Sequence, residues 1–79
     1  DYYALLVAGT AAELEADFAI FNDAFSVCIV DNMIAQSGQT AAEVLNNDDV
    51  TNETLAYNAG IACLSELSPD ELEALMAAV

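Results

Sequence analysis

Hydrophobic residues recur at helical spacing along most of the chain. Between residues 10 and 37 they follow a single seam with steps of three and four, the period of a helix face that packs on a core. This pattern predicts one long helix over 10–37. A competing interpretation is a strand over 25–30, which is rich in β-forming residues but has no evident second strand to pair with. The seam consists of Leu14, Phe18, Phe21, Phe25, Cys28 and Asn32.

Capping boxes mark the expected helix starts. In this motif a Ser or Thr hydroxyl accepts from the backbone N–H three residues later, and the Glu side chain at that later position accepts from the backbone N–H of the Ser or Thr. Three such boxes begin at Thr10, Thr40 and Ser68. Pro69 follows the last of them at a favoured first helical position. Gly38 is placed to end the long helix as a C′ glycine.

These starts and stops predict an all-α fold, a small bundle of about four helices in one domain, 1–79. The expected helices cover 10–37, 40–46, 52–67 and 69–79. The apolar segment 1–9 is expected to dock as an arm or a short helix on its own core or on a neighbour.

The phenylalanine seam has two interpretations. An aromatic stripe at helical spacing is typical of a packed core. It can also line a pocket for an apolar ligand or an interaction surface. From Val27 to Ile34 the apolar residues spread around the whole helix, which in so small a domain indicates a partner subunit on the second face. The candidate interaction or ligand residues are Leu14, Phe18, Phe21 and Phe25.

The chain has no Lys, Arg or His, and its 14 Asp and Glu give a formal net charge of -14, although 57% of its residues are hydrophobic. Nucleic-acid binding depends on cationic side chains, so we expect none, and anionic membranes should repel the chain. Without imidazole or Lys, only a carboxylate pair or a thiol could serve catalysis. We therefore expect no enzyme and no cofactor, and a diffuse cloud of cations around the protein.

Cys28 and Cys63 are the only cysteines. In an exported protein such a pair indicates one disulfide, whereas in the cytosol both would be inert core thiols. The chain begins at Asp1 rather than Met, so either a removed signal peptide or a shortened chain is expected. We expect a secreted, extracellular protein. Asn52 begins a glycosylation sequon, which counts only in a eukaryotic secretory pathway.

Other polar groups have weaker signals. The loop 46–53 is rich in oxygen-bearing side chains, but it lacks the glycine and the spacing of an EF-hand, so we expect no metal site. The acidic clusters near Glu13 and Glu71 fit helix starts, where negative charge is favourable. Asp31 and Asn32 lie in the most apolar segment. Asn32 could fix helix register, and Asp31 either senses pH from a semi-buried position or faces solvent.

The sequence favours a non-enzymatic interaction or structural module that self-associates, as a subunit of an extracellular assembly. Repulsion between carboxylates should raise their pKa values in the folded chain, which gives stability that is lost as pH rises through about 4 to 6. Association should therefore tighten with acid, salt or divalent cations. The alternatives are a carrier of a small hydrophobic ligand and a secreted signalling protein.

Overall fold

Five α-helices and one short 3-10 helix make up the described residues, 1–78, of this computed structural model, and no strand occurs in that range. The all-α prediction is thus confirmed, as is the Cys28–Cys63 disulfide. In chain order the elements are α1 (Tyr2–Phe18), α2 (Asp23–Ser37), α3 (Ala41–Asn46), α4 (Asp49–Ala62), η1 (Leu64–Glu66) and α5 (Pro69–Ala77).

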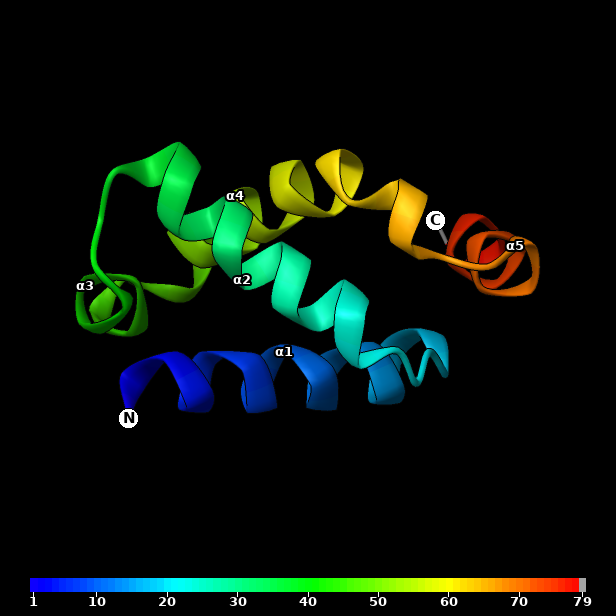
Figure 1. The fold of residues 1–79 in the computed structure, drawn as a ribbon, viewed down its shortest axis with the longest axis horizontal. Coiled ribbons are helices and arrows are strands. Elements are labelled where there is room, and N and C mark those ends of the chain that lie inside the picture. Colours follow the sequence, from blue (N-terminus) through cyan, green and yellow to red (C-terminus); the bar gives the residue numbers. More distant parts are fainter. Residues whose placement is uncertain (79) are drawn as a thin grey trace.

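Helix α2 is the centre of the bundle (Figure 1). Helices α1 and α4 both pack on α2, and they run in roughly the same direction as each other and opposite to α2. The short α3 lies at one end of the molecule, against α1, and α5 lies at the other end. The chain measures 33 × 20 × 20 Å along its principal axes.

The expected helix over 10–37 is wrong, because the chain reverses between α1 and α2. Ala19 adopts the left-handed conformation with φ 55° and ψ 36°, and its N–H donates to the carbonyl of Glu15. Ile20 then turns into the core, where it is almost fully buried. A straight helix over this range would be about 42 Å long, which exceeds the whole molecule, and it could not pack on itself.

Asn22 makes the new helix start. Its side-chain oxygen accepts from the backbone N–H of Phe25 at 3.0 Å, which caps α2. Its side-chain nitrogen donates to the carbonyl of Glu66 at 2.9 Å and to the carboxylate of Glu71 at 3.0 Å. One asparagine therefore caps α2 and fixes the C-terminal part of the chain to it.

The N-terminal boundary also differs from expectation. Asp1 caps α1 by accepting from the backbone N–H of Tyr3 at 3.0 Å, so Thr10 lies inside the helix and does not cap it. Residues 1–9 are the cap and first turns of α1 rather than a separate arm. The apolar side that begins at Leu6 continues to Leu14, and both residues are buried, which gives a reason for one uninterrupted helix.

The remaining helix limits follow the capping chemistry more closely. The capping boxes at Thr40 and Ser68 are both formed, and α3 ends at Asn46 as expected. Helix α4 starts earlier than the expected 52, because Asp48 accepts from the N–H of Thr51 at 2.7 Å. It ends at Ala62 rather than 67, where Cys63 leaves the helix and joins α2.

The core lies around α2. Each large apolar side chain that it buries contributes about 1.5 to 3 kcal/mol relative to exposure. Among the described residues, every buried side-chain nitrogen and oxygen has a hydrogen-bond partner. The buried hydrophobic residues are Leu6, Leu14, Ile20, Phe25, Ile29, Val30, Met33, Val44, Ala59 and Cys63.

Candidate binding groove

A groove of about 990 Å³ runs between α1 and α4. Its floor is one side of α2, where Phe25, Ile29 and Met33 follow one another at steps of four. Leu45 of α3 lines one end, and Leu75 of α5 lines the other. The groove exists because α1 and α4 each pack on α2 and not closely on each other.

The groove gathers most of the exposed large hydrophobic side chains of the described residues. Six of the ten side chains in that class line it, with exposed fractions from 37% to 69%. Single exposed hydrophobic residues are ordinary on a protein surface, but a contiguous apolar surface marks an interaction or ligand site. The six are Leu5, Leu45, Tyr57, Ile61, Leu64 and Met76.

Two glycines lie in the walls of the groove, Gly9 in α1 and Gly60 in α4. A Cβ atom added at either position would meet nothing within 4 Å, so neither glycine permits a close approach inside the chain. A glycine in a helix interior costs about 1 kcal/mol relative to Ala. Packing within the described chain therefore gives no reason for either residue, although both widen the groove.

Carboxylates line the groove in two pairs. Glu13 and Asp17 are four residues apart on α1, and Asp49 and Glu53 are four residues apart on α4. All four are exposed. Like charges at this spacing on a helix destabilise it by about 0.2 to 0.5 kcal/mol. The chain has no side-chain cation to compensate them.

The predicted phenylalanine seam is divided by the turn at 19–22. Leu14, Phe18 and Phe25 all line the groove, Leu14 and Phe25 as buried residues and Phe18 as a half-buried one. Phe21 does not line it and is 75% exposed in the turn. The seam therefore supplies part of the floor and of one wall. The exposed apolar residues of α4, Tyr57 and Ile61, were not among the predicted residues.

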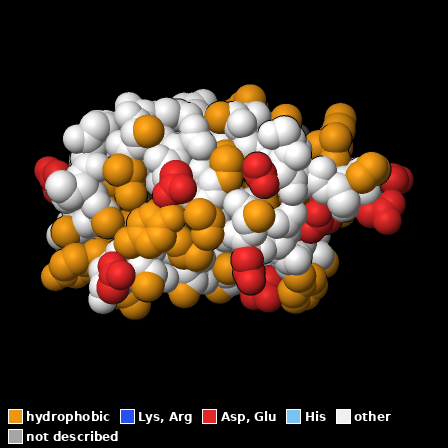
Figure 2. All heavy atoms as spheres, viewed as in Figure 1, with side chains coloured by type: hydrophobic (Ala, Val, Ile, Leu, Met, Phe, Trp, Pro, Cys, Tyr) orange, Lys and Arg blue, Asp and Glu red, His pale blue; other side chains and the backbone are white. Residues whose placement is uncertain are grey.

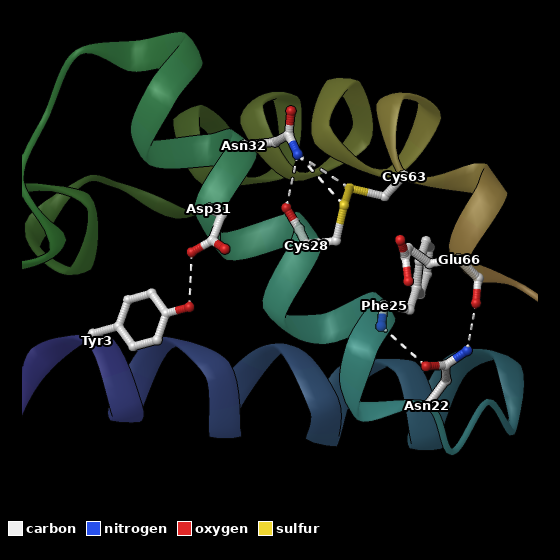
Figure 3. The surroundings of a disulfide bond; sticks show 8 residues. All are labelled: Tyr3, Asn22, Phe25, Cys28, Asp31, Asn32, Cys63 and Glu66. Atoms are coloured by element: carbon white, nitrogen blue, oxygen red, sulfur yellow. Dashed lines mark hydrogen bonds between the residues drawn. A yellow bond between two sulfur atoms is a disulfide. The ribbon is translucent and has the colours of Figure 1, made fainter.

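Asp31 and Asn32 lie outside the groove, around the disulfide (Figure 3). The side-chain nitrogen of Asn32 donates to the carbonyl of Cys28 at 2.9 Å and contacts the Sγ atoms of Cys63 at 3.3 Å and Cys28 at 3.5 Å. Asp31 is exposed rather than semi-buried, and it accepts from the Tyr3 hydroxyl at 2.7 Å. This hydrogen bond is the main cause that raises the pKa of Tyr3.

Three of the carboxylates that cap helix starts have a lowered pKa. Backbone hydrogen bonds lower the pKa of Glu43 at Thr40, of Asp48 at Thr51 and of Glu71 at Ser68. These shifts are opposite in sign to the rise expected from mutual repulsion. A lowered pKa gives stability that is present above the unfolded value and is lost as pH falls through the folded value.

Asn52 is half-buried at the edge of the groove. Its side-chain nitrogen, the atom that would carry a glycan, donates to the carbonyl of Val44 at 2.8 Å, and its oxygen accepts from Asn47 at 3.2 Å. Glycosylation at this residue stays a prediction. Within 1–78, no three His, Cys, Asp or Glu side chains gather closely enough to hold a metal ion.

The surface carries one sign of charge. On the face shown in Figure 2, hydrophobic side chains lie in patches between scattered carboxylates, with no basic side chain among them. None of the described helices is long and apolar enough to cross a membrane. Compared with known proteins, the chain matches no family model, no curated protein and no solved structure.

Proposed function

We propose that this domain is a non-enzymatic, exported interaction module and that the groove between α1 and α4 is its interaction surface. The observation that carries the proposal is the gathering of six of the ten exposed large hydrophobic side chains in that one groove. Helix grooves of this kind take up the apolar face of a partner element. The Cys28–Cys63 bond supports export, because disulfides persist in oxidising compartments.

Under mild acid or high salt, the composition favours an interaction between two copies of this chain through the groove. Two copies at a formal charge of -14 each repel one another at neutral pH. Protonation or screening of the carboxylates weakens this repulsion and leaves the apolar attraction in place. Association should therefore tighten as pH falls or as salt or a divalent cation is added.

Sedimentation between about pH 4.5 and 7.5 tests self-association. The lower limit avoids the acid range in which the capping carboxylates lose their contribution. A Phe21→Ser, Val50→Ser double variant is a matched control, since both residues are about three-quarters exposed outside the groove. An Ile61→Ser, Met76→Ser variant should lose association while the control keeps it. A concentration-independent monomer under all conditions would end the proposal of self-association.

The size of the groove favours a second candidate, a carrier of a small hydrophobic ligand. Its volume of about 990 Å³ is at the upper end of the range typical of small-molecule sites, about 300 to 1,000 Å³. Native mass spectrometry of protein from its natural source tests this. A ligand mass that disappears in the Ile61→Ser, Met76→Ser variant supports a carrier, and a bare protein mass removes it.

A further inference from the structure

We infer that the natural occupant of the groove is a cationic amphipathic helix of a partner protein, which lays its apolar face on α2 between α1 and α4. The inference rests on the proposed function only in taking the groove as the interaction surface. It differs from self-association in naming a partner whose charge is opposite to that of this chain.

Charge complementarity is the first argument. Glu13 and Asp17 lie towards the C-terminal end of α1, whereas Asp49 and Glu53 lie at the start of α4. Because α1 and α4 run in the same direction, the two pairs lie on opposite walls and towards opposite ends of the groove (Figure 1). A helix in the groove would meet carboxylates on one flank near its first turns and on the other flank near its last. Lys or Arg at those positions would offset the like-charge pairs.

A second copy of this chain cannot supply such a partner surface at neutral pH. It has no Lys, Arg or His, so every side chain that it could place against these carboxylates is neutral or anionic. Like charges brought together across an interface oppose binding and select against the wrong partner. The acidic positions along the groove therefore favour a basic partner over self-association.

The glycines are the second argument. Gly9 and Gly60 lie in opposite walls of the groove, and a Cβ atom at either would project into open space. Small residues allow a helix backbone to approach closely, and they are otherwise unfavourable inside a helix. A helix lying between α1 and α4 would use the space that both glycines leave. This gives a reason for two residues that the packing of the described chain does not explain.

The test uses a synthetic helix of about 18 residues, which at ~1.5 Å per residue is close to the length of α1. Leu would occupy one face, and Lys would occupy the positions on both flanks. Binding to the intact protein would be followed by fluorescence anisotropy at neutral pH, in about 50 mM and about 500 mM salt. Two control peptides carry Glu in place of every Lys, or the same residues in scrambled order.

Two sets of variants separate the groove from the general negative field. A groove-neutral variant carries Glu13→Gln, Asp17→Asn, Asp49→Asn and Glu53→Gln. The matched control changes the same number of charges at exposed residues that do not line the groove, with Glu15→Gln, Asp23→Asn, Asp70→Asn and Glu73→Gln. If each of the four exposed ion pairs contributes about twofold, the groove-neutral variant should bind about sixteenfold more weakly than the control.

A Gly9→Leu, Gly60→Leu variant fills the groove. Neither new side chain meets the protein at its Cβ atom, and Leu is a much better helix former than Gly, so the variant should fold at least as well as the parent. Thermal unfolding checks this. The inference expects a stable protein that no longer binds the Lys peptide.

Any of the following results would overturn the inference. They are equal weakening by the groove-neutral and control variants, undiminished binding by the glycine-filled variant, and equal binding of the Glu peptide. A groove-dependent dimer that ignores the Lys peptide would also reject the inference while supporting self-association. A protein that is a monomer at every pH and binds the Lys peptide through the groove would support the inference and reject self-association.

Discussion

Breaking the Cys28–Cys63 bond is expected to lower the free energy of unfolding by about 4 kcal/mol. The bond closes a loop with a sequence separation of 35 residues. In the chain-entropy account, restricting a loop of that size in the unfolded chain is worth about 4 kcal/mol at room temperature. A domain of this length is expected to have only about 4 to 12 kcal/mol in total. Reduction should therefore remove a third or more of the stability.

Urea denaturation of the oxidised and the reduced protein measures this loss. Reduction leaves both sulfur atoms in place, so it removes the cross-link with little change in packing. The unfolded chain becomes less restricted and exposes more surface, so the slope of stability against urea should increase as the midpoint falls. A Cys28→Ala, Cys63→Ala variant should lose at least as much, because Cys63 is fully buried and its sulfur fills space in the core.

The result that would refute this reasoning is a reduced protein within about 1 kcal/mol of the oxidised one, with an unchanged urea slope. That outcome would mean that the unfolded chain already holds α2 and the end of α4 together without the bond. A large loss confined to the double alanine variant would place the contribution in core packing instead of the cross-link.

Three further predictions concern single residues. Asn22→Ala should lower the free energy of unfolding by about 2 to 3 kcal/mol, since it removes a helix cap and two longer-range hydrogen bonds. The control Asn58→Ala, at an exposed residue, should change it by less than about 0.5 kcal/mol. Equal effects in urea would contradict the role given to Asn22. Ala19→Gly should raise the free energy of unfolding by about 1 kcal/mol, and with it the melting temperature, because glycine adopts the left-handed conformation without the strain that alanine has there. A lower melting temperature would contradict this prediction. Glu43→Gln should flatten the loss of stability below about pH 4.5, because the pKa of Glu43 is lowered in the fold by its bond to the Thr40 backbone. An unchanged pH profile of urea midpoints would argue against this contribution.

Local capping chemistry explains which parts of the fold could be predicted from the sequence. The boxes at Thr40 and Ser68 form as expected because each needs only residues three apart. The box at Thr10 has the same sequence pattern but lies inside α1, since Asp1 already caps the helix and its buried side continues past Thr10. The reversal at Ala19 was missed because a left-handed alanine carries no sequence signal. It is required by the packing of α2 against α1.

The groove was only partly predictable for the same reason. The pattern marked Leu14, Phe18 and Phe25 as one apolar seam, and these residues do line the groove. The exposure of Ile61 depends on how far α4 lies from α1, which no local pattern specifies. A signal was nevertheless present in the two mid-helix glycines, because neither acts as a cap.

The two walls of the groove are held to its floor by different means. Helix α4 is joined to α2 by a disulfide at its end, whereas α1 is connected to α2 by side-chain packing, the hydrogen bond from Tyr3 to Asp31 and a four-residue reversal. We therefore expect α4 to keep its position and α1 to tilt about that reversal when partners of different width bind in the groove. Chemical reduction would remove this difference and leave both walls held to α2 without a cross-link.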